Sequence, residues 1–150
     1  MLEINKQSDI TSFLAKNAEN KKIILFDGVC NLCDSAVLFI IKHDKKDVFR
    51  FAALQSEIGK EICKHIGVDI TKVDSIIFYE PGVAYYYKSG AAIAIAENLG
   101  VLWSWFSVFK IIPVFLRDPL YNYIAKNRYK WYGKKESCMI PTPELKAKFL

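Results

Sequence analysis

The chain is poor in residues that hold metals, with four cysteines and two histidines among 150 residues. Cys30 and Cys33 form a C-x-x-C pair, and no second pair of that spacing follows. A structural zinc site usually takes four ligands from two such pairs, or from one pair and closely spaced histidines. The other candidates stand singly: Cys63, Cys138, His43 and His65. The sequence therefore favours another use of the pair, with a zinc-binding module as the alternative.

An export signal and an apolar run long enough to span a membrane are also lacking. Residues 1–10 (MLEINKQSDI) contain no basic segment followed by an apolar one, so we expect a reducing, cytoplasmic location. The largely apolar segment 101–116 includes Lys110 and Pro113. Its 16 residues fall short of the ~20 apolar residues that a membrane-spanning helix needs. We expect this segment to pack on the core or line a substrate groove, with contact to a membrane surface as the alternative.

No recognisable RNA- or DNA-binding motif accompanies the net charge of +5. Residues 1–116 hold 13 basic and 13 acidic residues, whereas residues 117–150 hold 8 basic and 3 acidic residues. The C-terminal segment is also rich in tyrosine and tryptophan. We expect a solvated basic face there and no nucleic-acid partner.

The C-x-x-C pair lies where an apolar run, residues 23–26, gives way to the helical pattern of residues 35–43. Two cysteines three residues apart in the first turn of a helix have Cβ atoms roughly 5–6 Å apart, close enough for a disulfide. The unbonded N–H groups of that turn favour a thiolate on Cys30. A disulfide here would tie together residues that the helix already holds, so we predict reversible thiol–disulfide exchange rather than a structural staple.

The residues around Asp27 also resemble the nucleophile loop of haloacid-dehalogenase-type phosphatases. That chemistry needs an aspartate nucleophile two residues before Asp27, where this chain has Leu25. The phosphatase interpretation is therefore not favoured.

The remaining pattern predicts an α/β protein with alternating strands and helices. A leading helix is expected over residues 9–18, capped by Ser8 or Asp9, and Cys63 is expected in the core. Strands are expected at 22–26, 48–53, 75–79 and 83–87, and core helices at 33–42, 56–66 and 91–99. This β-α-β-α-β-β-α order is that of a thioredoxin-like core, with the 22–26 strand central in the sheet.

Two further helices are expected after residue 100. The first covers residues 101–112, and the second runs from Asp118 as cap, with Pro119 at its first position, to Tyr132. We expect one domain, with a core at about 22–100 and a C-terminal helical extension at about 101–150.

Several short motifs within about residues 22–143 share one resemblance. They comprise Asp27, Gly28, Cys30, Cys33, Gln55, Asp74, Ser75, Lys88, Ser89, Ala91, Ala92, Ile112, Pro113, Arg117, Asp118, Tyr121, Asn127, Arg128, Tyr129, Gly133 and Cys138. Together these residues are similar to the DCC family, described as predicted thiol–disulfide oxidoreductases with a thioredoxin-like fold. The resemblance implies exchange with protein or small-molecule thiols and disulfides, and we expect no bound cofactor.

The family motif carries over Asp27, Cys30 and Cys33, with Cys138 as an accessory member. We expect Cys30, exposed at the helix start, to attack and Cys33 to resolve the mixed disulfide. Asp27 has two open roles: accepting a proton from a thiol, or bonding the N–H groups of its own loop.

Arg117 and Arg128 are accessory candidates for the site. Arg117 and Arg128 would stabilise a thiolate if the C-terminal helices fold over the site; solvation or a salt bridge to Asp118 or Glu97 is the favoured alternative.

Residues 72–75 contain no proline where thioredoxins place a cis-proline, so substrate docking should differ. The dipeptide between the cysteines is Asn-Leu rather than Gly-Pro, and both directions of electron flow stay open.

Overall fold

A central mixed sheet organises the computed structural model, which describes residues 2–18, 21–73, 76–100, 102–134 and 142–150. In these residues the strands are β1 (Lys22–Phe26), β2 (Phe49–Ala53), β3 (Ile77–Glu80) and β4 (Ala84–Tyr87), in the order β2-β1-β3-β4. β1 pairs parallel with β2 and antiparallel with β3, and β3 pairs antiparallel with β4. The predicted central position of β1 is confirmed.

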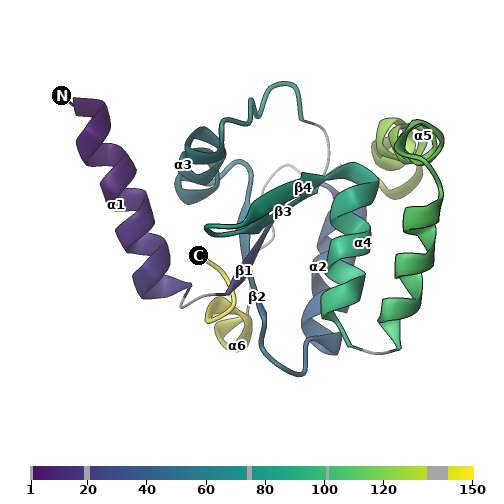
Figure 1. Ribbon diagram of the computed structural model, residues 1–150, viewed down its shortest axis with the longest axis horizontal. Helices are drawn as coiled ribbons and strands as arrows, with labels where there is room; N and C mark the ends of the chain where they lie inside the picture. The colour runs from purple at the N-terminus through teal and green to yellow at the C-terminus, as the bar shows by residue number, and fades with distance from the viewer. Residues whose placement is uncertain (1, 19–20, 74–75, 101, 135–141) are drawn as a thin grey trace.

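Helices cover both faces of the sheet (Figure 1). α2 (Asn31–His43) and α4 (Lys88–Asn98) pack on one face, while α1 (Leu2–Asn17) and α3 (Glu57–Ile66) lie on the other. The side chains of β1 alternate between the two layers, because successive residues of a strand point to opposite faces. Ile24 and Phe26 join the α2–α4 layer, and Ile23 and Leu25 join the α1–α3 layer. This arrangement is a thioredoxin-like α/β fold, as predicted.

The predicted boundaries of α3 are confirmed by its caps. The Ser56 hydroxyl accepts a hydrogen bond from the Gly59 N–H, and Gly67 ends the helix with a φ of 75°. Cys63 is buried on this helix, as expected. The expected cap of α1 is wrong: Ser8 and Asp9 lie inside α1, because the residues before them also favour a helix and extend it to Leu2.

The C-terminal extension departs from the prediction in two places. Residues 103–111 form a 3₁₀ helix, η1 (Trp103–Ile111), rather than an α-helix. α5 (Val114–Tyr132) begins after Pro113, so Asp118 and Pro119 lie inside it and do not start it. The fixed φ of Pro113 suits a helix start, and the exposure of Phe115 allows water to take the backbone bond that Pro119 cannot make. The Asp118 carboxylate instead accepts from the Ser89 hydroxyl at 2.5 Å.

The last residues cover the outer edge of the sheet at β2. After the short helix α6 (Pro143–Lys146), the Phe51 N–H donates to the Lys148 carbonyl, and the Leu150 N–H donates to the Phe51 carbonyl, both at 2.8 Å. These bonds satisfy backbone groups that an edge strand would otherwise expose.

Candidate active site

The two cysteines lie at the start of α2, immediately after β1 ends. Cys30 is the N-cap residue, and its N–H donates to the Asp27 carbonyl at 3.2 Å. Cys33 occupies the third position of the helix, and both cysteines are free thiols. Cys30 has an exposed fraction of 0% and Cys33 of 9%. The expected exposure of Cys30 is therefore wrong.

Cys30 packs in the α2–α4 core layer, and the chain at the end of α5 returns beside its backbone. Residues 132–134, which we call the strap, pair with Cys30 through an antiparallel bridge to Lys134. The side-chain amide of Asn31 donates to the Tyr132 carbonyl at 2.8 Å. Gly133 has a φ of 86°, and a Cβ atom there would lie 3.0 Å from the Asn31 amide nitrogen. The strap therefore requires glycine at this position.

Asp27 is the centre of a polar cluster beside the cysteines. One carboxylate oxygen accepts from the Val29 N–H at 3.1 Å and from the Gln55 amide at 2.7 Å. The other accepts from the Arg128 guanidinium at 3.0 Å and from the Tyr129 hydroxyl. The expected bond from Asp27 to its own loop is thus present, and the carboxylate also ties α5 to the end of β1.

Arg128 reaches this cluster because α5 folds back over the site. Its side chain is 4% exposed and that of Asp27 is 8% exposed, so the ion pair is buried. The favoured expectation of solvation or a salt bridge to Asp118 or Glu97 is wrong for Arg128, and Glu97 pairs with Lys110. Arg117 lies eleven residues earlier, about 16 Å along the same helix. The structure thus brings Arg128 to the site and leaves Arg117 away from it.

Some predicted positions cannot be placed. Cys138 lies outside the described residues, as do Asp74 and Ser75. The described residues contain no cis peptide bond, and the N–H of Ile76, just before β3, donates to the Tyr121 hydroxyl at 3.3 Å.

Burial and nearby charges set the acidity of the site. Burial raises the pKa of Cys33 to about 12, and the hydrogen bond with the Cys30 thiol adds to the effect. The Asp27 carboxylate raises this pKa further, whereas the Arg128 guanidinium lowers it. Burial and the hydrogen bond to Asp27 also raise the pKa of Tyr129 to about 12. Cys33 and Tyr129 are therefore both protonated at neutral pH.

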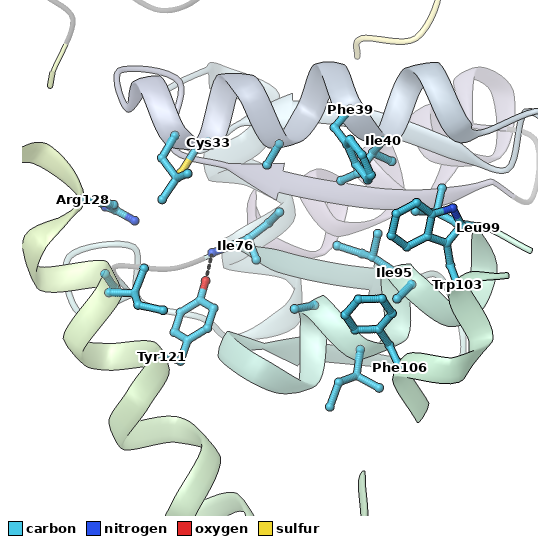
Figure 2. Close-up of a pocket in the computed structure, with 17 residues that line it drawn as sticks. Cys33, Phe39, Ile40, Ile76, Ile95, Leu99, Trp103, Phe106, Tyr121 and Arg128 are labelled. Atoms are coloured by element: carbon cyan, nitrogen blue, oxygen red, sulfur yellow. Dashed lines mark hydrogen bonds between the residues drawn. The ribbon is translucent and has the colours of Figure 1, made fainter. Parts of the chain in front are cut away.

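An apolar cavity of about 360 Å³ lies beside Cys33. Figure 2 shows Cys33 and Arg128 toward one end of it and Trp103 and Phe106 toward the other. These two aromatic residues belong to η1, so the segment expected to line a groove does line a cavity.

The part of the chain that the structure describes shows neither a metal-binding cluster nor a membrane-spanning helix. There, no three or more His, Cys, Asp or Glu side chains gather in a way that could hold a metal ion. No helix in the same ranges is long and apolar enough to cross a membrane. η1, the residue before it and the start of α5 nevertheless expose large apolar side chains, namely Leu102, Trp105, Val108, Ile111, Val114, Phe115 and Leu116.

Two sequence comparisons agree with the resemblance found in the motifs. The family model described as DCC1-like thiol-disulfide oxidoreductase matches residues 24–134. The uncharacterized protein YuxK of Bacillus subtilis is 47% identical over 129 residues, which cover 86% of this chain and 93% of that protein. A chloroplastic DCC family protein of Arabidopsis thaliana is 37% identical over 121 residues, which cover 80% and 70%. No solved structure matches.

Sequence reasoning identified the cysteines and Asp27 but missed three other parts of the site. Gln55, Tyr129 and Gly133 stood among the motif residues without an assigned role. Their roles depend on contacts between segments about 28 or 102 residues apart, such as the bonds from Gln55 and Tyr129 to Asp27. Only their place within the family motif could have indicated them.

Proposed function

Since this chain belongs to the DCC1-like thiol-disulfide oxidoreductase family, we propose that it exchanges electrons with thiols and disulfides through a Cys30–Cys33 couple. One observation carries the proposal: two free thiols occupy the cap and the third position of a single helix and hydrogen-bond to each other. This placement suits closure to a disulfide with little backbone movement.

The reaction needs no other redox group. A thiolate attacks one sulfur of a disulfide, a mixed disulfide forms, and a second thiol releases the first partner. Two protein thiols are oxidised to the Cys30–Cys33 disulfide while a substrate disulfide gains two electrons and two protons, or the reverse. The partners are protein or small-molecule thiols and disulfides.

In this proposal Asp27 and Arg128 are positioning residues that set the charge around the dithiol. Their opposite effects on the pKa of Cys33 support this role, as does their buried ion pair between α5 and the end of β1. Attack by Cys30, the order expected from the sequence, requires a local opening of the site, because Cys30 is fully buried and its backbone pairs with Lys134 of the strap.

The test is a redox titration of the full chain in glutathione buffers, with thiols trapped by alkylation and located by peptide mass. We expect Cys30 and Cys33 to oxidise together in one two-electron step, while Cys63, buried on α3, stays a thiol and serves as the internal control. A pair that stays fully reduced or fully oxidised in every buffer would overturn the proposal.

The single variants Cys30→Ser and Cys33→Ser assign the order of the two sulfurs. The variant that keeps the attacking sulfur accumulates a mixed disulfide with glutathione, because the resolving thiol is missing. Equal accumulation of the mixed disulfide in both variants would mean that glutathione reacts equally well with either sulfur, so that neither has a fixed role.

A further inference from the structure

The cavity beside Cys33 has the size and lining of a small-molecule site. Its volume of about 360 Å³ falls within the range of ligand pockets, which are mostly apolar with a few polar groups. α2, α4, η1 and α5 all contribute to its walls. Figure 2 shows the polar groups, namely the Cys33 sulfur, Arg128 and the Tyr121 hydroxyl, gathered toward one end.

Of the two cysteines, Cys33 lines this cavity and Cys30 does not. Cys30 is fully buried, and its backbone pairs with Lys134 of the strap. A ligand in the cavity would therefore meet the sulfur of Cys33 first.

Backbone groups that flank the dithiol are already bonded within the chain. The Asn31 N–H faces the Gly133 carbonyl at 3.5 Å, and the Ile76 N–H donates to the Tyr121 hydroxyl at 3.3 Å. An extended peptide gains affinity by pairing with open backbone groups. At these two positions such pairing is blocked, which favours a small molecule over a peptide.

The charge at the Cys33 end is balanced. The Arg128 guanidinium is 3.0 Å from the Asp27 carboxylate, so its positive charge is paired within the protein. The other walls are made of alanine, leucine, isoleucine and aromatic side chains. An anionic thiol such as glutathione would lose its hydration in this cavity without gaining a countercharge.

We propose that the cavity binds an uncharged, apolar thiol or disulfide and presents its sulfur to Cys33. The proposal rests on the proposed function and names its substrate class. In one direction the Cys33 sulfur attacks a substrate disulfide, and one half leaves as a thiol. The Cys30 sulfur then attacks Cys33, the second half leaves as a thiol, and the protein holds the Cys30–Cys33 disulfide. Two electrons and two protons pass to the substrate, and the reverse sequence oxidises two apolar thiols.

The first experiment compares two disulfides as oxidants of the reduced full chain. Dibenzyl disulfide is the apolar probe, glutathione disulfide is the charged probe, and free dithiothreitol corrects for their intrinsic reactivities. We expect the corrected rate with dibenzyl disulfide to be higher by at least about tenfold, since the cavity accepts an apolar substrate. Equal corrected rates would overturn the inference and leave the redox couple intact.

Filling the cavity provides the matched test. Ala96 and Ala125 line it from α4 and α5, whereas Ala15 is exposed on α1, outside the cavity. Ala96→Leu or Ala125→Leu should reduce the preference for dibenzyl disulfide by about tenfold, and Ala15→Leu should leave it unchanged. Two cavity variants are used so that poor folding of one does not decide the result. An unchanged preference in a folded cavity variant would contradict the inference.

Binding of an unreactive ligand tests the cavity independently of the redox reaction. Dibenzyl sulfide lacks the reducible bond, and its binding can be followed by the change in tryptophan fluorescence, because Trp103 is the one of the three tryptophans that lines the cavity. We expect saturable binding in the wild type that weakens by about tenfold in Ala96→Leu. If dibenzyl sulfide binds but neither disulfide oxidises the pair, the proposed function fails and the cavity remains a ligand site. If it does not bind while both disulfides react equally, the cavity inference alone fails.

Discussion

Replacing Asp27 with asparagine should destabilise the protein by about 3–5 kcal/mol, the usual effect of removing one partner from a buried ion pair. The pair with Arg128 is 3.0 Å long, and both side chains are less than a tenth exposed. The variant takes the countercharge away from a guanidinium that α5 holds in the interior. For a chain of 150 residues, this corresponds to a fall in Tm of about 6–20 °C.

The assay is urea unfolding at neutral pH with reductant present, so that the cysteines stay thiols. Lys110→Met is the matched control, because the Lys110–Glu97 pair is comparably short at 2.7 Å but exposed on the lysine side. Its loss should cost less than about 1 kcal/mol. An Asp27→Asn effect no larger than that of the control would refute the reasoning, since it would mean that the buried pair contributes nothing.

The double variant Asp27→Asn with Arg128→Met completes the cycle. It should be less destabilised than the sum of the single variants, because neither buried charge then lacks its partner. The same variants report on the site: Cys33 should be alkylated faster in Asp27→Asn and more slowly in Arg128→Met. This follows because the carboxylate raises the pKa of Cys33 and the guanidinium lowers it.

Three further predictions concern the acidity of Cys33, the glycine of the strap and the cap of α3. The alkylation rate of Cys33 should rise about tenfold per pH unit between about pH 7 and 10. With a pKa of about 12, Cys33 stays mostly protonated over this range, and its thiolate fraction grows tenfold with each pH unit. A plateau of the rate near neutral pH would contradict this. Gly133→Ala should speed alkylation of Cys30, located by peptide mass, and lower the free energy of unfolding by about 1 kcal/mol or more, since alanine is strained at a φ of 86°. Unchanged labelling would show that the strap does not control access. Ser56→Ala should cost about 1 kcal/mol in urea unfolding through loss of the α3 cap, and a neutral result would argue against that bond.

Local patterns made the core predictable. The apolar run of β1, the Ser56 cap and the Gly67 stop each act within a few residues, and the structure confirms all three. The same holds for the cysteine pair, since its place at the start of α2 follows from where β1 ends.

The contacts made by α5 and the strap were not predictable in this way. Arg128 meets Asp27 across 101 residues of chain, and no local spacing encodes that approach. The prediction that Pro119 takes the first helical position followed from the local sequence, but α5 starts at Val114, directly after Pro113. An exposed helix can contain Pro119, because water takes the one backbone bond that the proline cannot make. The predicted exposure of Cys30 was wrong for a similar reason. A helix start is open to solvent only when no other segment packs against it, and local sequence does not show such packing.

The extension after residue 100 therefore changes the chemistry of the pair as well as its access. Burial keeps Cys33 protonated at neutral pH, so its own attack on a disulfide is slow. When the pair is oxidised, Cys33 needs no thiolate of its own, because the incoming thiol supplies the nucleophile and the sulfur of Cys30 departs. In the proposed reaction, the apolar cavity then selects which thiols approach. A covered dithiol of this kind is suited to selecting its partner by apolar contacts with α4, η1 and α5 rather than by the general reactivity of an open thiolate.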